Sequence, residues 1–266
     1  MVRLSEIIEE LENLAPPQLA ESWDNVGLHV GNADDRIQNV YVCLEITSEN
    51  VKKAVDFGAD LIVSHHPLIF RPLRCVVEED VNGGIIRTLI SNNISAYCMH
   101  TNFDKADGGM NDLLAQKLGL ENVRKFTADE CVDESGKPLD EIGRVGTLEY
   151  PMSFEDFIEH TKSVLSCRAL RYMGDIGETV QTVALCSGSG GDYIYSAYHS
   201  GADAYVTADL GHHDAQAARE LGLNIIDAGH FETENIICEF LHEFLYNRFP
   251  DLNVKISDAE PYFTGA

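Results

Sequence analysis

The chain has 266 residues, of which 44% are hydrophobic and 24% are charged, the balance of a globular protein that buries its own core. Its 19 Lys and Arg residues are outnumbered by 44 Asp and Glu residues, which leaves a formal net charge of −25 at pH 7. A charge of this sign repels a phosphate backbone, so nucleic acid is not an expected partner.

The sequence carries no signal for export or for a membrane anchor. No apolar run reaches the ~18 residues that a membrane helix needs. The first residues, Met-Val-Arg-Leu-Ser-Glu, do not form the apolar stretch of a signal peptide. The seven Cys residues are odd in number and include no CxxC pair, which fits buried free thiols in a reducing compartment. We therefore expect a cytoplasmic protein that does not bind membranes.

Residues 1–120 predict an alternation of helices and strands. A first helix has apolar residues at helical spacing, begins near Ser5 as its N-cap and is stopped by Pro16 and Pro17. Short apolar strands that alternate with helices indicate βαβ units and a mostly parallel sheet. Strands are predicted at 40–46, 61–63 and 94–99, and helices are predicted between them at 48–57 and 85–90.

The middle of the chain has a different character. Residues 121–180 contain a polar, turn-rich stretch at 129–138 and a capping box that begins at Ser153, and we expect them to form a small linking region. Strands are predicted again at 183–186 and 223–227. A helix over 236–245 should follow, with Thr233 as its cap.

A Gly-rich turn, Ser187 to Gly191, connects the strand at 183–186 to the next helix. Such a turn at a helix N-terminus can hold an anion. This one lacks the Lys-Ser/Thr pair of a P-loop and the spacing of a dinucleotide-binding fingerprint. Tight backbone geometry is the more ordinary reason for its glycines, and both interpretations stay open.

The two halves of the sequence resemble each other. Residues 58–65 (GADLIVSH) align with residues 201–208 (GADAYVTA), and the pattern His-x-x-x-Asp/Glu occurs at 100–104 and again at 230–234. We therefore expect an α/β fold with two related lobes, whose mostly parallel sheets face a metal-containing cleft. The first lobe would span residues 1–120, with the C-terminal segment 225–266 packed back on it. The linking region and the second lobe would occupy residues 121–224.

His65 and His66 are the sharpest local signal for chemistry. They end a predicted strand, and the carboxyl ends of parallel strands are where ligands bind in α/β folds. Adjacent side chains at a strand end point to opposite sides, so the pair can reach two ions if the backbone turns, as Pro67 favours. Without further ligands nearby, the pair would equally fit two structural histidines.

Further ligands occur at i, i+4 spacing, which puts two side chains on one helical face. Glu234 is expected in the first turn of the helix that Thr233 would cap, where a carboxylate is favourable and can bridge two cations. Mixed His and carboxylate ligands select Zn, Fe, Mn or Co over Ca or Mg, and small ligand sets leave positions open as catalytic sites do. We expect two divalent ions per chain (Zn, Fe or Mn), bound by His65, His66, Asp104, His230 and Glu234.

Four motifs in this order resemble the NIF3-like family, over nearly the whole chain: SWDNVGL at 22–28, SHHPL at 64–68, HTNFD at 100–104, and Gly229-His230 with Glu234. Members are often called GTP cyclohydrolase type 2 homologues or dinuclear-metal hexameric proteins. The resemblance implies that His65 and Asp104 bind one ion, that His66 and His230 bind the other, and that Glu234 bridges them. It also implies two related lobes and a homohexameric ring, with the metal sites facing an internal cavity.

The expected function is that of a metal-dependent hydrolase acting on a nucleotide-like small molecule. Two ions can activate a shared water toward an electrophilic carbon or phosphorus. If the substrate is GTP, as the family label implies, purine C8 is attacked and formate leaves. His100 and Glu234 are the expected catalytic residues, because either can transfer protons. The alternative is a non-catalytic metal-binding ring that acts as a regulator, metal store or adaptor, since the sequence carries no substrate motif.

Several polar residues near the motifs allow more than one role. Glu45 stands where many relatives have Asp, which leaves its role open. His100 is also suited to orient a ligand from outside the coordination shell. Four other residues are polar enough to line the expected cleft and equally suited to cap a helix or form a turn: Asp24, Asn25, Asp209 and His213.

Overall fold

The computed structural model describes residues 1–125 and 142–263. It divides into two compact units: Met1–Ala106 with Ile237–Glu260 form unit 1, and Asp107–Ile236 with Pro261–Ala266 form unit 2. These bounds differ from those of the lobes expected from the sequence, 1–120 with 225–266 and 121–224. The polar stretch predicted at 129–138 lies wholly within residues 126–141, outside the described residues.

Unit 1 is built on a five-stranded sheet in the order β13-β4-β5-β6-β2. The first four strands are parallel to their neighbours and only β2 is antiparallel, so this sheet is mostly parallel, as predicted. A separate antiparallel pair, β1 and β3, lies near the N-terminus. The strands are β1 (Val2–Arg3), β2 (Gly27–Val30), β3 (Arg36–Ile37), β4 (Asn39–Cys43), β5 (Leu61–Ser64), β6 (Ser95–Cys98) and β13 (Asn253–Ile256).

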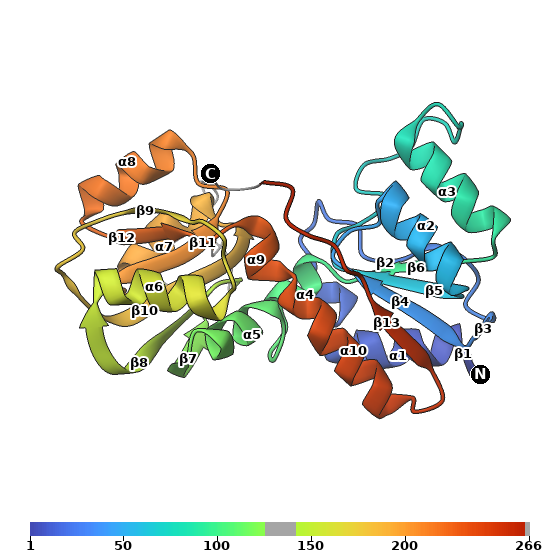
Figure 1. Ribbon diagram of the computed structural model, residues 1–266, viewed down its shortest axis with the longest axis horizontal. Helices are drawn as coiled ribbons and strands as arrows, with labels where there is room; N and C mark the ends of the chain where they lie inside the picture. The colour runs from blue at the N-terminus through green and yellow to red at the C-terminus, as the bar shows by residue number, and fades with distance from the viewer. Residues whose placement is uncertain (126–141, 264–266) are drawn as a thin grey trace. The chain divides into compact units, whose positions relative to one another are not determined.

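Helices cover both faces of this sheet, with α2 and α3 on one side and α1 and α10 on the other (Figure 1). The helix at 48–57 is confirmed: the Thr47 side chain accepts from the Asn50 N–H at its start, and Gly58 ends it at φ 74°. The first helix begins one residue before Ser5, with Arg3 as the N-cap. The helices are α1 (Leu4–Leu14), η1 (Pro17–Leu19), α2 (Ser48–Phe57), α3 (Val81–Ser91), α4 (Thr101–Lys105) and α10 (Ile236–Arg248).

Unit 2 is built on a six-stranded mixed sheet in the order β7-β8-β10-β11-β12-β9. Its three central strands are parallel, whereas β7, β8 and β9 are antiparallel to their neighbours. The expectation of a linking region at 121–180 is therefore wrong for the described part, because that stretch supplies strands of the sheet. The strands are β7 (Leu120–Lys125), β8 (Arg144–Ser153), β9 (Arg171–Met173), β10 (Thr179–Ser189), β11 (Ala204–Ala208) and β12 (Asn224–Asp227).

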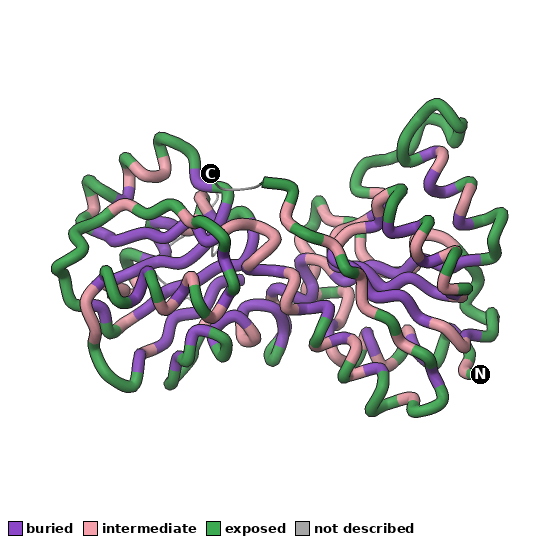
Figure 2. Tube along the Cα trace, viewed as in Figure 1, coloured by how far each residue is buried: buried purple, intermediate pink, exposed green. Residues whose placement is uncertain are grey.

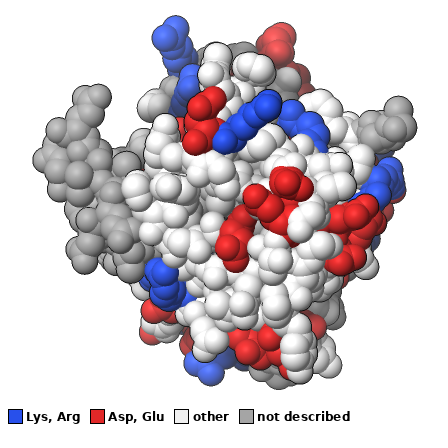
Figure 3. Space-filling model, turned by 90° about the vertical axis from the view of Figure 1, so that its left-hand side faces the viewer, with Lys and Arg blue, Asp and Glu red and all other residues white. Residues whose placement is uncertain are grey.

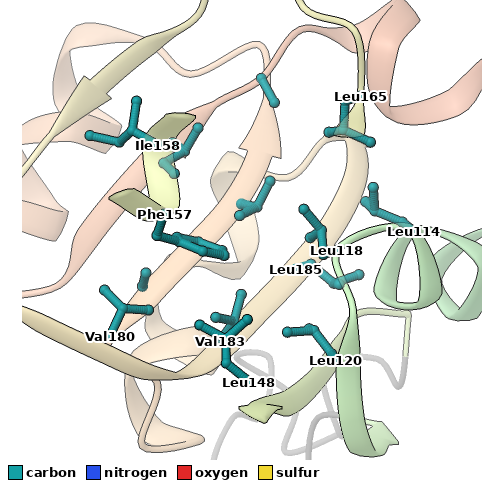
Figure 4. Close-up of a cluster of buried hydrophobic side chains, with 14 of the residues drawn as sticks. Leu114, Leu118, Leu120, Leu148, Phe157, Ile158, Leu165, Val180, Val183 and Leu185 are labelled. Atoms are coloured by element: carbon teal, nitrogen blue, oxygen red, sulfur yellow. The ribbon is translucent and has the colours of Figure 1, made fainter. Parts of the chain in front are cut away.

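Alternating side chains of this sheet supply two apolar clusters. Val183 and Leu185 of β10 belong to a cluster with Leu114 of α5 and Phe157 of α6 (Figure 4). Ala184, on the same strand, belongs instead to a second cluster, which includes residues of α7 and α8. Period-two alternation thus gives both faces of the sheet a core. The helices are α5 (Met110–Lys117), α6 (Phe154–Val164), η2 (Gly191–Tyr193), α7 (Ile194–His199), α8 (His212–Leu221) and α9 (His230–Glu234).

The two units share one topological pattern, which accounts for the repeat in the sequence. Strands β4, β5 and β6 lie side by side in parallel, and so do β10, β11 and β12. In each unit the third strand is followed at once by a short helix, α4 or α9. The strands are mostly buried and the outer helix faces are exposed (Figure 2). The α/β fold with two related lobes is therefore confirmed.

The described residues also bear on the cysteines and on membrane insertion. Six Cys residues lie in the described ranges, all as free thiols, and only Cys75 is exposed. Burial raises the pKa of Cys43 and of Cys98 well above the ordinary thiol value, which keeps both thiols protonated and unreactive. Across the same ranges, no helix has both the length and the hydropathy needed to cross a membrane.

Candidate metal centre

Two neighbouring strands of unit 1 deliver three imidazoles to one edge of the sheet. β5 runs into His65 and His66, and β6 runs toward His100. Because β5 and β6 are parallel, their carboxyl ends lie at the same edge. The ring centroids lie 5.2 to 5.7 Å apart, and one nitrogen from each ring lies within 4.8 Å of the other two. Three nitrogen donors at this spacing are able to share a metal ion.

Each of the three rings is held at Nδ1 by an oxygen. Nδ1 of His65 lies 2.7 Å from the Met99 carbonyl oxygen, and Nδ1 of His66 lies 3.1 Å from a Glu45 carboxylate oxygen. Nδ1 of His100 lies 2.9 Å from the Asp24 carboxylate. An imidazole whose Nδ1–H donates to such an oxygen leaves the Nε2 lone pair for a metal, and the oxygen fixes the ring and makes it more basic.

Asp104 adds a carboxylate to this set. It lies on the short helix α4, is 6% exposed, and places Oδ1 3.5 Å from Nε2 of His65. The Cys98 thiol donates to the carbonyl oxygen of His65 at 3.0 Å and so helps to fix the backbone of that ligand. The structure thus brings together four candidate residues of unit 1: His65, His66, His100 and Asp104.

Asp24 joins the SWDNVGL motif to the turn that carries His100. Its carboxylate accepts hydrogen bonds from the Thr101 N–H at 3.1 Å and the Thr101 hydroxyl at 2.5 Å, in addition to His100. Burial of Asp24 opposes ionisation, but the hydrogen bond and positive charge of His100, with donors from Thr101 and Asn25, lower the pKa of Asp24 to about 2. Asp24 is therefore a charged anchor for His100 at neutral pH.

An aromatic wall, formed by Trp23 and Phe70, stands beside His100. The Trp23 and Phe70 rings meet edge to face at 5.8 Å, and each ring centroid lies 6.3 Å from that of His100. Asn25, which the sequence left open, donates to the Ile69 carbonyl oxygen and so ties the loop of Trp23 to that of Phe70. Trp23 is 59% exposed and Phe70 is 44% exposed. The imidazoles therefore have apolar neighbours on one side.

Unit 2 carries a second set of donors, made of His230, Glu234 and Asp209. Nδ1 of His230 lies 2.7 Å from an Asp209 carboxylate oxygen, and Nε2 of His230 lies 2.9 Å from Oε2 of Glu234. Asp209 directly follows β11, and His230 begins the short helix α9 after β12. His230 thus resembles the three imidazoles of unit 1 in having Nδ1 held by an oxygen, and its Nε2 lies beside a candidate ligand.

The helix around Glu234 differs from the sequence prediction. Thr233 lies within α9 and is not the N-cap of the following helix. Its hydroxyl donates to the carbonyl oxygens of Gly229 and His230, and accepts from the Gly188 N–H. Glu234 is the last residue of α9 and is not in the first turn of a longer helix. The single helix predicted here is broken at Asn235, so that α10 starts anew at Ile236.

The Gly-rich turn packs against Glu234. Gly188 has φ +58°, and a Cβ atom there would lie 2.1 Å from Oε1 of Glu234 and 3.4 Å from Cε1 of His230. Gly190 is as tightly enclosed, since a Cβ atom would lie 2.2 Å from the Thr207 hydroxyl. The glycines at 188 and 190 are therefore needed for close packing around a candidate ligand, which favours the geometric interpretation of this turn.

Sequence reasoning left the roles of Glu45 and Asp209 open, and the structure gives each an imidazole partner. Asp209 aligns with His66 in the internal repeat, and each residue follows the middle one of three parallel strands. This alignment is the feature of the sequence that could have identified Asp209 as part of the candidate site. Glu45 lies two residues beyond β4, near the carboxyl end of that strand. His213 has a different position: it lies in the first turn of α8, is exposed, and its ring contacts His212.

The donor chemistry fits divalent transition metals. Neutral imidazole nitrogen and carboxylate oxygen are the usual ligands of Zn, Fe and Mn, and carboxylates or carbonyls outside the coordination shell commonly hold the ligating histidines. Unit 1 supplies His65, His66 and Asp104 for such a site, and unit 2 supplies His230 and Glu234. Neither set resembles a Ca site, which would be built from oxygens alone.

The chain resembles known proteins in sequence and in structure. The family model described as Duf34/NIF3 (NGG1p interacting factor 3) matches residues 2–261. The chain is 39% identical over 233 residues to a GTP cyclohydrolase 1 type 2 homolog of Clostridium perfringens, covering 88% of this chain and 87% of that protein. It is 38% identical over 264 residues to a GTP cyclohydrolase 1 type 2 homolog of Streptomyces coelicolor, covering 97% and 92%.

Solved structures agree with the sequence comparison. A Bacillus cereus protein related to NIF3 superposes with a TM-score of 0.88 at 26% identity, covering 100% of this chain and 99% of that one. Reduced HcgD from Methanocaldococcus jannaschii superposes with a TM-score of 0.81 at 33% identity, covering 97% and 98%. Sequence and fold agree, and the chain belongs to the Duf34/NIF3 family.

Proposed function

We propose that the chain binds two divalent metal ions through His65, His66, Asp104, His230 and Glu234, and hydrolyses a nucleotide-like substrate. The observation that carries the proposal is shared by four imidazoles: each has Nδ1 held by a carboxylate or carbonyl oxygen. Purely structural histidines need no such uniform restraint. That the donors of the two units serve one dinuclear centre is part of the proposal, and it is supported by membership of the family.

The residues of this chain would have separate roles in the proposed reaction. Two bound ions supply Lewis-acid activation of a water and of the substrate. His100 is held and oriented at Nδ1 by the ionised Asp24, so Nε2 of His100 is suited to give or take a proton. Glu234, 4% exposed, is suited to bridge the ions and to accept a proton from the water. The aromatic wall gives His100 an apolar neighbour on one side.

The test combines metal content with activity. Protein purified without chelators is analysed for metals and, with its content known, screened against nucleoside triphosphates and phosphoesters. We expect close to two divalent ions per chain and turnover of at least one nucleotide that is lost in Glu234→Gln. A folded protein that holds no metal and takes up none from added Zn or Mn would refute the proposal. Metal without turnover would leave the metal site standing and remove the hydrolase.

A second candidate function is the non-catalytic metal-binding ring. One observation favours it: Gly188 of the Gly-rich turn packs on Glu234, which removes this turn as a cradle for a substrate phosphate. We also propose that the chain assembles as a homohexamer and resides in the cytoplasm, which the free thiols support. The activity screen on metal-loaded protein separates the two candidate functions.

A further inference from the structure

Asp227 is a buried carboxylate that the proposed chemistry does not use. It ends β12, is 8% exposed, and lies three residues before His230. Its Oδ2 accepts the Leu210 N–H at 3.1 Å and a guanidinium N–H of Arg171, and its Oδ1 accepts the Gly229 N–H at 3.4 Å. The carboxylate therefore binds two separate turns and the edge strand β9.

These two turns carry the Asp209–His230 pair. Leu210 directly follows Asp209, and Gly229 directly precedes His230. The turn at Asp209 needs restraint, because Asp209 has φ +55°, a left-handed conformation that a residue other than glycine rarely adopts. Fixing Leu210 and Gly229 to one carboxylate therefore fixes how Asp209 meets His230.

Arg171 completes the arrangement. Its guanidinium donates to Asp227 and, at 2.8 Å, to the Leu210 carbonyl oxygen. Leu210 is thus bound at its N–H by Asp227 and at its carbonyl by Arg171. The guanidinium also balances the charge of Asp227, which would otherwise be a costly buried anion. The hydrogen bonds of Asp227 and Arg171 run to the backbone of the two turns and to each other, so the pair acts on the candidate ligands through the backbone.

We infer that Asp227 and Arg171 are positioning residues, which hold Asp209 against His230 and so set the affinity of the His230–Glu234 donors for a metal. The metal in this inference rests on the proposed function, whereas the geometry of the Asp209–His230 pair does not. Partners outside the coordination shell typically change metal affinity about 10- to 100-fold when they are removed. The inference predicts an effect of that size from residues that touch no metal.

The test compares Asp227→Asn and Arg171→Gln with two controls in unit 2. Arg219→Gln removes one exposed positive charge from α8, and Ile225→Val weakens the core on the same strand as Asp227. Zn²⁺ affinity is measured by competition with a chromogenic chelator, and the unfolding of the metal-free protein is followed in urea. We expect about 10- to 100-fold weaker binding of one ion in Asp227→Asn and Arg171→Gln, and unchanged binding in both controls.

A second readout needs no metal. The Nδ1 proton of His230, hydrogen-bonded to Asp209, should give a downfield proton resonance that His230→Gln removes and that Asp227→Asn weakens or shifts. Unchanged Zn²⁺ affinity and an unchanged resonance in Asp227→Asn would overturn the inference while the proposed function stands. Wild-type protein that binds no Zn²⁺ would refute the proposed function, and the resonance would then decide the positioning role alone. Equal loss of affinity in Ile225→Val would show that the effect is one of stability, and would overturn the inference too.

Discussion

Glu234 is the residue on which the proposed two-metal chemistry depends most. If it bridges the ions, Glu234→Gln removes one charge from both coordination spheres while it keeps the shape of the side chain. We expect lower occupancy at both sites in Glu234→Gln, at mainly one site in His65→Ala, and at mainly the other in His66→Ala. Elemental analysis of the three dialysed variants side by side checks this, and full occupancy in Glu234→Gln would exclude the bridging role.

Gly188 offers a test of how tightly Glu234 is held. In Gly188→Ala the new Cβ would lie 2.1 Å from Oε1 of Glu234, so the carboxylate must move. Gly201→Ala is the matched control, because Gly201 has φ +79° and a Cβ there meets nothing within 4 Å. Both variants should lose ~1–2 kcal/mol of unfolding free energy to the left-handed backbone, but only Gly188→Ala should lose metal affinity. Equal metal affinity in the two variants would contradict this.

Asp24 predicts a pH dependence of stability. Its pKa is about 2 in the folded chain, against an ordinary value of 3.8. A lowered pKa means that the unfolded chain binds the proton first, so the contribution of Asp24 is complete above about pH 4 and is lost as the pH falls through about 2. The difference in unfolding free energy between metal-free wild type and Asp24→Asn should therefore be constant from pH 6 to 4 and shrink below pH 4. A difference independent of pH, measured by urea titration, would refute this.

The sequence predicted which candidate ligands lie close together better than it predicted the side chains that support them. His65, His66 and Asp104 follow strands whose parallel order is readable from local patterns, so their meeting at one sheet edge was foreseeable. Glu45 and Asp209 reach their imidazoles from other strands of the same sheet, over 21 residues in each case. Such pairs depend on strand order and register, which one sequence does not reveal.

At the scale of elements, helix α6 begins at the capping box predicted at Ser153, and this cap can be tested. The Ser153 hydroxyl accepts from the Asp156 N–H at 3.1 Å, as the capping box predicted. Ser153→Ala should cost ~1 kcal/mol of unfolding free energy because that N–H loses its partner. Ser163→Ala, an exposed position near the end of the same helix, should be neutral or slightly stabilising. Equal effects in urea denaturation would argue against the cap.

The sequence predicted helices and strands well where local signals were strong, and poorly where a strand forms by pairing with a strand distant in the sequence. The helix at 48–57 has a cap, a regular apolar face and a terminal Gly58, and its bounds match. Strands β7 and β9 are the edges of their sheet and β8 lies next to β7, and runs of exposed residues in all three interrupt the apolar signal. Their antiparallel pairing to distant strands leaves no local mark. The break between α9 and α10 was also missed, because the apolar spacing continues across it.

At the scale of the whole molecule, the excess of acidic residues is compatible with the proposed nucleotide-like substrate. On the face shown in Figure 3, Asp and Glu side chains gather near the centre and Lys and Arg lie in separate groups around them. A strongly acidic chain favours solubility and disfavours anionic polymers. A nucleotide would then need local positive charge, which bound divalent ions would supply.

The proposed homohexamer is testable directly. Large apolar side chains are exposed on each chain, among them Tyr150 at 72% and Val81 at 70%, and subunit contacts would cover some of them. Light scattering coupled to gel filtration should give six times the 29.4 kDa chain mass at micromolar concentration. A stable monomer at the same concentration would contradict the ring, although it would leave the donors within each unit unchanged.

The position of Trp23 has an optical consequence. It is the only tryptophan of the chain, and its ring lies 6.3 Å from His100. An excited indole is quenched by a protonated imidazole in contact range and by paramagnetic ions such as Co²⁺ or Cu²⁺, whereas Zn²⁺ has no unpaired electrons with which to quench. The tryptophan fluorescence of the chain therefore originates beside the candidate ligands. Its intensity should report the arrival of a paramagnetic ion, and it would distinguish that ion from Zn²⁺ in a single sample.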